Sequence, residues 1–262
     1  MLKKLIKHEI YATGRILLPL YGITIILSFV NRIMIGINKF NNTPLNIIST
    51  ITMFFYVFAI IATIITTFIL IVFRFYKNLM TDEGYLMFTL PVKPFQLINS
   101  KLISAIFWII ISVVVTITSL LILLLNAERV TIIRDIWAYV YKMLKNNFGD
   151  NYVYLFLEMI LITFISIIQQ ILLIYVSIAA GHLFSGHKIL GSFASYIAIN
   201  TAAQLVSLLV LLAMASFTGS SFEKLEKLPH AILIIAIVLC SIYSILYYLA
   251  TNYILSKKLN LE

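Results

Sequence analysis

Six long apolar stretches, separated by short polar segments, dominate the chain. They cover residues 16–37, 47–73, 102–125, 153–183, 189–217 and 231–255. A helix needs roughly 20 apolar residues to cross a hydrocarbon core of about 30 Å, and every stretch is long enough. Unbroken runs of Leu and Ile favour helices over the alternating strands of a membrane barrel. We therefore predict an all-α integral membrane protein with six transmembrane helices.

The composition excludes a soluble protein. Of the 262 residues, 62% are hydrophobic and 11% are charged, and the mean hydropathy is +1.05. Both fractions lie far from those of soluble domains. The net charge of +9 does not indicate a nucleic acid, because basic residues beside membrane spans bind anionic lipid headgroups. The predicted partner of this charge is the lipid bilayer.

The basic residues also predict the orientation. If the N-terminus is inside, eleven of the nineteen Lys and Arg residues fall in the inner segments: Lys3, Lys4, Lys7, Arg15, Arg74, Lys77, Lys93, Lys101, Lys188, Lys257 and Lys258. Cytoplasmic segments of membrane proteins carry such an excess. We expect a multi-pass protein of the cell membrane with both termini in the cytoplasm.

The first fourteen residues have the pattern of an amphipathic helix at the membrane surface. Leu2, Leu5, Ile6 and Ile10 share one helical face, and Lys3, Lys4, Lys7 and His8 share the other. Gly14 is a predicted break before the first span. A cleaved signal peptide is the alternative, but no small-x-small cleavage site follows the apolar run. We predict an interfacial helix at 1–14 and a six-span domain at 15–262.

Two further segments have amphipathic spacing on the outer side. The segment 131–151 places Ile132, Ile136, Trp137 and Val140 at helical intervals, which predicts a helix lying along the membrane surface. The segment 220–230 is shorter, with Ser221 as its cap, and ends before Pro229. Both are interpreted as lids over helix ends, and a gate for a molecule leaving the membrane is the alternative.

The spacing of ionisable residues argues against an enzyme. Glu158 and Arg32 are isolated charges within spans, and no two carboxylates share a span for acid–base catalysis. The four histidines do not have the spacing of metal ligands. The sequence "GHLFSGHK" at 181–188 has the glycine spacing of a phosphate-binding loop, but His187 stands where that loop needs Lys. We predict no metal and no nucleotide site on this chain.

Uncharged polar residues gather near the middle of three spans. Gln169 and Gln170 lie in the fourth, Asn200 and Gln204 in the fifth, and Ser112, Thr116 and Ser119 form a stripe on the third. Hydrogen bonds between helices are the first explanation, and at least one pair of the four amides should bond between the two spans or across a dimer. A polar path for a substrate is the alternative.

A polar interruption at 77–102, "KNLMTDEGYLMFTLPVKPFQLINSKL", separates the second and third spans. Thr81 is a good N-cap, and Asp82 and Glu83 suit the first turn of a short helix that Pro91 ends. Pro94 permits a new helix that continues into the third span. The exposed apolar residues of the short helix indicate a protein partner, and a loop packed on its own bundle is the competing interpretation.

These features together resemble the membrane permease subunits of the type-2 ATP-binding-cassette exporter family. The resemblance rests on the basic amphipathic start, the six spans, "DEGYLMFTLPVKPFQLINSKL" at 82–102 and "GHLFSGHKILGS" at 181–192. Its most specific part is the acidic-Gly-Tyr-Leu-x-x-Thr-Leu-Pro segment. The family implies an N-terminal elbow helix, a second permease subunit, identical or related, and a separate cytoplasmic ATPase that binds ATP and Mg.

The resemblance also implies which residues contact that ATPase. They form a coupling helix: Asp82, Glu83, Gly84, Tyr85, Leu86, Met87, Phe88, Leu90 and Pro91. The polar residues of the connection between the fourth and fifth spans, His182, His187 and Lys188, are a candidate second contact. A peptide, an antibiotic or a lipid-like molecule would each agree with the resemblance as the exported substrate.

Two other classes of protein remain as alternatives. An ion-driven secondary carrier should show inverted repeats, broken helices or a carboxylate at the midplane, and we find none of these features in the sequence. A membrane scaffold or sensor subunit that transports nothing is the other alternative. A soluble ATPase that co-purifies with the chain would separate the exporter from both.

Overall fold

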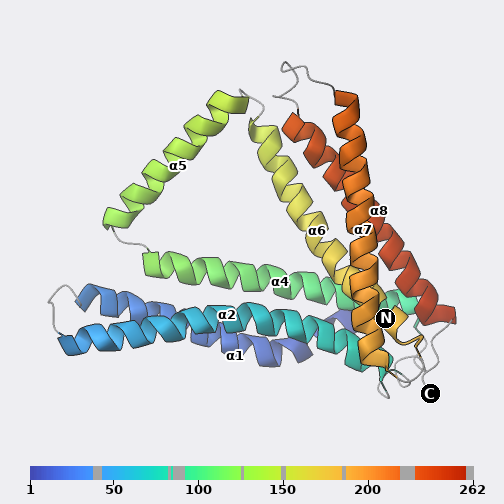
Figure 1. Cartoon of the computed structure of the whole chain (residues 1–262). Coiled ribbons are helices and arrows are strands. Elements are labelled where there is room, and N and C mark those ends of the chain that lie inside the picture. The colour runs from blue at the N-terminus through green and yellow to red at the C-terminus, as the bar shows by residue number, and fades with distance from the viewer. Residues whose placement is uncertain are drawn as a thin grey trace. The chain divides into compact units, whose positions relative to one another are not determined.

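The computed structural model describes residues 1–37, 43–81, 84, 92–124, 127–148, 152–184, 187–218 and 228–257, and nearly all of them are helical (Figure 1). The helices are α1 (Leu2–Ile37), α2 (Thr43–Met80), α4 (Pro94–Leu124), α5 (Ala127–Phe148), α6 (Tyr152–Gly181), α7 (Lys188–Thr218) and α8 (Leu228–Lys257). These residues contain no strand. The predicted all-α fold is confirmed.

Six of these helices are long and apolar enough to cross a membrane. The spans are Leu2–Gly36, Leu45–Met80, Pro94–Leu124, Tyr152–Gly181, Lys188–Met214 and His230–Lys257. They confirm the six predicted spans, and most extend beyond the predicted bounds. The longest helix, α2, has 38 residues and at about 1.5 Å per residue measures roughly 57 Å, well beyond a hydrocarbon core of about 30 Å.

The remaining helix, α5, has the amphipathic sequence that predicted a helix at 131–151. Ile132, Ile136 and Trp137 are all exposed along it. The polar residues between them, such as Arg134 and Asp135, are equally exposed, so the helix is confirmed and its predicted place along a membrane surface stays a prediction. Of the second outer segment, 220–230, residues 220–227 lie outside the described residues. Leu228, Pro229 and His230 form the first turn of α8.

The N-terminal helix differs from the prediction. We expected a break at Gly14, but α1 continues through Gly14 and Pro19 without interruption. A Cβ atom at position 14 would lie 3.0 Å from Cζ2 of Trp108 on α4. The glycine therefore lets α1 approach the indole and does not end the helix. A separate elbow helix at 1–14 is not confirmed.

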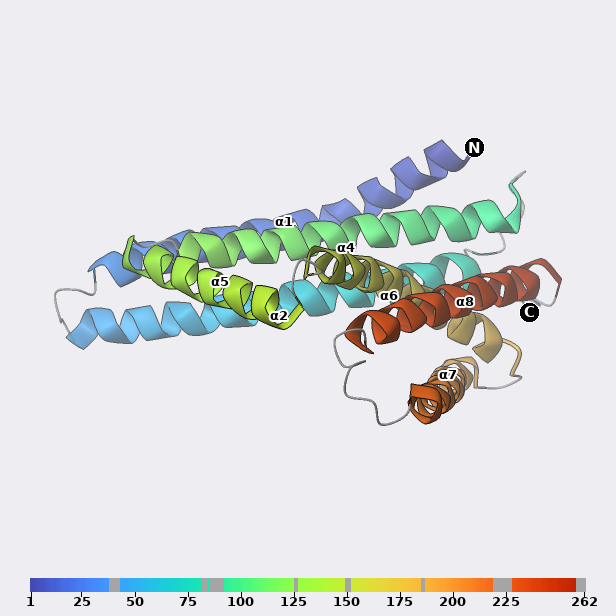
Figure 2. The same cartoon turned by 90° about the horizontal axis from the view of Figure 1, so that it is seen from above.

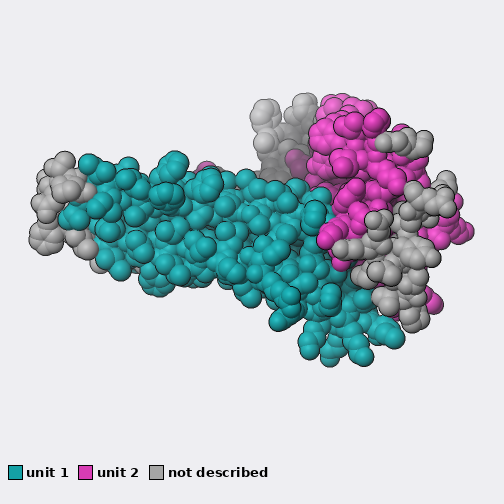
Figure 3. All heavy atoms as spheres, turned by 90° about the horizontal axis from the view of Figure 1, so that it is seen from below, with its two compact units in different colours: residues 1–74, 99–138 teal, residues 75–98, 139–262 magenta. Residues whose placement is uncertain are grey.

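The chain divides into two compact units (Figure 3). Unit 1 comprises Met1–Arg74 and Asn99–Ala138, and unit 2 comprises Phe75–Ile98 and Tyr139–Glu262. Both α2 and α4 therefore contribute to each unit. In unit 2, α6 packs against α7 and α8, and the Phe75 ring stacks on Tyr175 with their centroids 3.8 Å apart.

Unit 1 is built on α1, most of α2 and most of α4, which run side by side (Figures 1 and 2). Its apolar centre consists of Leu17, Tyr21 and Trp108, with Ile10, Leu70, Ile111 and Val115 packed against it. The Tyr21 and Trp108 rings have centroids 6.1 Å apart. Aromatic burial of this kind gives the three helices a common packing centre.

A row of polar side chains joins α1 to α2, and we call it the α1–α2 polar seam: Tyr21 with Thr67, Thr24 with Thr63, and Asn31 with Thr52. The hydroxyl oxygens lie 3.0 Å apart in the first pair and 2.8 Å apart in the second. Asn31 Nδ2 donates to the Thr52 carbonyl at 3.1 Å, and the Thr52 hydroxyl donates to Asn31 Oδ1 at 3.1 Å. Because the two helices are antiparallel, these bonds set their register.

The stripe on the third predicted span has a mixed role. The Ser119 hydroxyl lies 3.2 Å from that of Tyr56 on α2, which is the expected kind of bond between helices. The Thr116 hydroxyl instead donates to the Ser112 carbonyl of its own helix. Thr and Ser often satisfy themselves in this way in transmembrane helices, so spacing alone overstates the number of contacts between helices.

We predict that Asn31→Leu lowers the free energy of unfolding by about 0.6 to 2 kcal/mol, because it removes both bonds to Thr52. Thermal unfolding of the protein in mild detergent, followed by circular dichroism, measures the loss. Thr50→Val is the matched control, since the Thr50 hydroxyl donates to the Asn46 carbonyl within α2. Equal losses in the two variants would contradict a role for the seam.

Candidate functional site

The predicted coupling helix is described at one of its residues. Asp82, Glu83, Tyr85, Leu86, Met87, Phe88, Leu90 and Pro91 lie outside the described residues. Gly84 is buried and helical, and its N–H donates to the Thr81 carbonyl at 2.7 Å. A Cβ atom at position 84 would lie 2.7 Å from the Leu79 carbonyl oxygen. The chain therefore passes the end of α2 so closely that position 84 has no room for a side chain.

Both flanks of this connection are anchored in unit 2. Leu79 and Met80 are buried at the end of α2, and Leu97 and Ile98 are buried at the start of α4. The helix α4 begins at Pro94, as predicted. The described residues on both sides of the connection are therefore packed within unit 2.

Thr81 makes a different bond from the predicted one. Its hydroxyl donates to the Lys77 carbonyl in the last turn of α2. Residues at the end of a helix leave carbonyl groups without partners within the helix. Thr81 therefore satisfies the end of α2, and the predicted cap on the following helix involves residues outside the described ones.

The candidate second contact follows α6. The predicted turn is confirmed, since α6 ends at Gly181 and α7 begins at Lys188. His182 Nδ1 lies 2.9 Å from the Ile178 carbonyl, and its ring centroid lies 5.4 Å from that of Tyr76 on α2. His187 is exposed. Within unit 2 the structure thus brings His182, but not His187, to the end of the helix that leads into the coupling segment.

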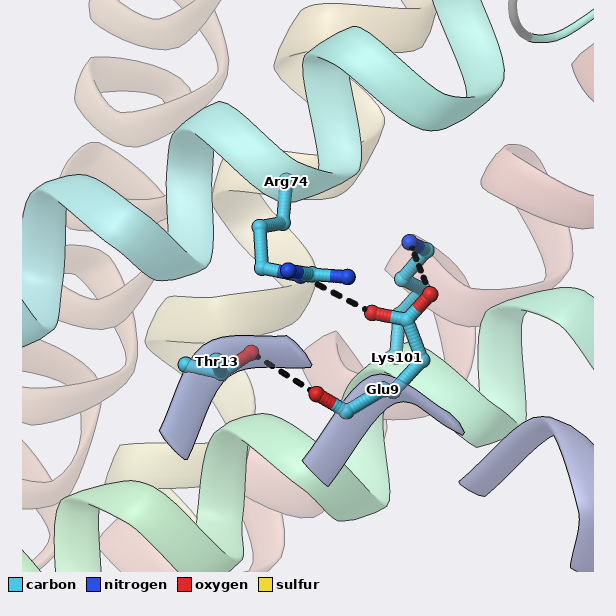
Figure 4. A network of polar contacts seen from close by, with 4 residues as sticks. All are labelled: Glu9, Thr13, Arg74 and Lys101. Carbon is cyan, nitrogen blue, oxygen red and sulfur yellow. Dashed lines mark hydrogen bonds and ion pairs between the residues drawn. The ribbon is translucent and has the colours of Figure 1, made fainter. Parts of the chain in front are cut away.

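A buried ionic cluster that the sequence analysis missed joins three helices of unit 1 (Figure 4). Arg74 Nε of α2 donates to Glu9 Oε2 at 3.1 Å, and Lys101 Nζ of α4 donates to Glu9 Oε1 at 2.6 Å. The exposed fractions of the side chains are 3% for Glu9, 3% for Lys101 and 18% for Arg74. We call Glu9, Arg74 and Lys101 the Glu9 cluster.

The cluster changes the interpretation of two basic residues. We expected Arg74 and Lys101 to lie beside their spans and to hold them at lipid headgroups. Instead, both are paired with a carboxylate, and Lys101 is buried. One signal was present in the sequence, because Glu9 follows Leu5 by four residues and Ile6 by three. A helix with this spacing places Glu9 on the apolar face, where a charge needs a partner.

The four amides near mid-depth behave differently from the cluster. Gln169 and Asn200 are half-buried, whereas Gln170 and Gln204 are exposed. In the structure no hydrogen bond joins any two of these four side chains. On α7 and α8 the bonds between helices come from Tyr243, whose hydroxyl lies 3.2 Å from that of Ser207 and donates to the Ala203 carbonyl at 3.1 Å. Of the two predicted partners for the amides, a neighbouring span or a second subunit, the contact between subunits stays a prediction.

A second polar pair lies in unit 2, between α6 and α8. His230 Nδ1 is 3.0 Å from Glu158 Oε2, and each side chain is 20% exposed. The sequence analysis treated Glu158 as an isolated charge, and its partner His230 lies 72 positions away along the chain. The described residues contain no group of three His, Cys, Asp or Glu side chains that could hold a metal ion.

Unit 1 also contains an apolar groove between α2 and α4, with a volume of about 340 Å³. Its lining residues are Ile64, Thr67, Phe68, Ile109, Ser112, Val113, Thr116 and Ile117. The Thr67 hydroxyl donates to Thr63 of its own helix, and the Thr116 hydroxyl donates to Ser112. These hydroxyl groups are therefore already engaged, and the groove offers an apolar surface.

We predict that Glu9→Leu lowers the free energy of unfolding by roughly 3 to 5 kcal/mol, because the buried Lys101 and the half-buried Arg74 lose their shared carboxylate. Adding Lys101→Met to this variant should cost less than the two single losses together, as coupled residues are not additive. Thermal unfolding of the four proteins forms the double-mutant cycle.

Arg134→Ala is the control for this cycle. Arg134 Nε lies 3.7 Å from Asp135 Oδ1, but both side chains are exposed. Such surface pairs contribute about 0 to 1 kcal/mol. Additive losses at Glu9 and Lys101, or a loss at Glu9 as small as that at Arg134, would contradict the importance of the cluster.

Comparison with known proteins does not assign the chain to a family. No family model matches the chain, and neither a curated protein nor a solved structure matches it. The residues of the chain and the resemblance of its motifs are therefore the grounds on which a function can be proposed.

Proposed function

We propose that the chain is the membrane permease subunit of an ATP-binding-cassette exporter. The observation that carries the proposal is the segment 82–91, whose sequence resembles the coupling helix of type-2 exporters and which connects two membrane spans. The buried flanks of this connection and the close packing at Gly84 support it. Six apolar helices supply the membrane domain that such a subunit needs.

In this proposal, catalysis and transport belong to different chains. A cytoplasmic ATPase binds ATP and Mg, closes on ATP and pushes on the coupling segment. The permease chain hydrolyses no ATP and changes its helix packing in response. A bound ligand can shift a conformational equilibrium only by binding one state more tightly than the other. The ATPase must therefore bind the coupling segment differently in its open and closed states.

One chain supplies half of the path, so a second permease subunit, identical or related, completes it. Gln204 supports this part of the proposal, because it is exposed on α7, a helix whose apolar window has no buried residue. Exposed amides in a span are costly in lipid unless another helix satisfies them. A peptide, an antibiotic or a lipid-like molecule would be the exported substrate.

The coupling assignment predicts a defective variant. Leu86→Asp should reduce ATPase recruitment at least tenfold, because it places an unpaired charge in a small interface. Insertion should survive, since residue 86 lies outside the six spans. Affinity purification of the tagged chain from its native host, with quantification of the bound ATPase, measures the effect.

Glu83→Ala is the matched milder variant, because a carboxylate in a first helical turn contributes only about 0.3 to 1 kcal/mol. Its ATPase recruitment should fall by less than about fivefold, which is the equivalent of 1 kcal/mol. Full ATPase binding by Leu86→Asp would show that the segment is only a loop. A wild-type chain that captures no ATPase would instead favour a carrier or a scaffold.

The proposed pairing of two identical chains predicts a covalent dimer. Gln204→Cys, in a Cys240→Ser background, should form a disulfide between subunits under mild oxidant, visible on a non-reducing gel. Ile64→Cys is the control, since Ile64 is exposed near the middle of α2. Gln170→Cys is tested in the same way. The contact is contradicted if neither Gln170→Cys nor Gln204→Cys forms a dimer, or if Ile64→Cys forms one to the same extent.

A further inference from the structure

The Glu9 cluster lies where two helices lead to the coupling connection. Arg74 is the last α2 residue of unit 1, and Lys101 follows the first α4 residue of unit 1, Asn99, by two positions. The connection between α2 and α4 is the one that carries the proposed coupling segment. Glu9 bonds to both cations, one from each helix (Figure 4). A single carboxylate on α1 thus ties together the two helices that frame the connection.

Stability alone does not explain why the protein buries these charges. Apolar residues of similar volume often pack as stably as a buried ionic group, because desolvating charges is costly. What the charges add is geometry, since the carboxylate accepts one bond on each oxygen, at 3.1 and 2.6 Å. Bonds this short resist sliding of one helix along another, whereas apolar contacts resist it less.

The rest of α1 is bonded to α2 and α4 farther along. Glu9 is held in its own helix by Thr13, whose hydroxyl donates to the Glu9 carbonyl at 2.9 Å (Figure 4). The α1–α2 polar seam begins at Tyr21, three turns beyond. Because α1 is one unbroken helix from Leu2 to Ile37, a displacement applied at Glu9 is carried along the whole of α1.

We propose that the Glu9 cluster transmits movement of the coupling connection to α1, with Glu9, Arg74 and Lys101 as positioning residues. The inference rests on the proposed exporter function and adds the point at which the movement enters unit 1. When the ATPase displaces the connection, Arg74 and Lys101 move with α2 and α4, and Glu9 draws α1 with them. Without the carboxylate, the ATPase still binds and hydrolyses ATP, but α1 no longer follows.

The test follows the far end of α1 while the ATPase changes state. A bimane fluorophore is attached to Ile33→Cys, an exposed position, in a Cys240→Ser background. The sample is the complete permease–ATPase complex in lipid nanodiscs, and its bimane emission is measured without nucleotide and again after trapping with ATP and vanadate. We expect trapping to change the bimane emission, and we expect Glu9→Gln to reduce that change at least fivefold. ATPase binding and ATP hydrolysis should remain within twofold.

Three variants separate transmission from general packing. Thr24→Val removes one hydrogen bond of the α1–α2 polar seam, in which the Thr24 and Thr63 hydroxyl oxygens lie 2.8 Å apart. It leaves the Glu9 cluster intact, so the emission change should persist. Lys101→Arg retains the cation and should also preserve it. Lys101→Gln keeps the Glu9–Arg74 bond but removes the second cation, so it should reduce the emission change. If Glu9→Gln does not insert into the membrane, Lys101→Gln takes its place in the test.

The outcomes distinguish this inference from the function on which it rests. A wild-type chain that binds no ATPase overturns both. ATPase binding with a full emission change in Glu9→Gln, or in Lys101→Gln where that variant takes its place, overturns the inference alone. An equal loss in Thr24→Val also overturns it, because α1 would then depend on packing in general. A loss confined to the variants that weaken the cluster supports it.

Discussion

The absence of water in the hydrocarbon core is the constraint from which the structure follows. Backbone groups there must bond within their own segment, so each span is a helix. Polar side chains must also find partners, which in unit 1 lie partly on the same helix and partly on neighbouring helices. The α1–α2 polar seam and the Tyr56–Ser119 contact are the result. Since lipid competes equally for apolar side chains, such bonds and close packing determine which helices are neighbours.

Charges obey the same constraint more strictly. Glu9 is buried, and the structure satisfies it with one cation on each carboxylate oxygen. Glu158 is less buried and pairs with His230. Exposed charges such as Arg134 and Asp135 need no such arrangement. The depth of burial therefore separates charges that join helices from charges that face solvent or lipid headgroups.

The same packing makes a case for how an outside motor could act on this chain. Gly84 lies so close to Leu79 at the end of α2 that position 84 has no room for a side chain. On the unit 1 side, Glu9 holds the two helices that frame the connection. A force on a loosely attached loop would be lost in the loop, whereas a force on a connection held at both flanks reaches the helices. The exporter proposal and the role of Glu9 share this physical basis.

Hydropathy and length by themselves determined the six spans and the all-α class, while amphipathic spacing predicted α5 and a proline predicted the start of α4 at Pro94. These are local properties, because a span needs only enough apolar residues and a helix start only the right dihedral angles. Tertiary structure decided the partners of Glu9, which are 65 and 92 residues away. It also decided the role of Gly14, which lies within the unbroken α1 and leaves room for Trp108 of α4. Contacts between distant residues depend on which helices become neighbours, and no local pattern in one sequence contains that information.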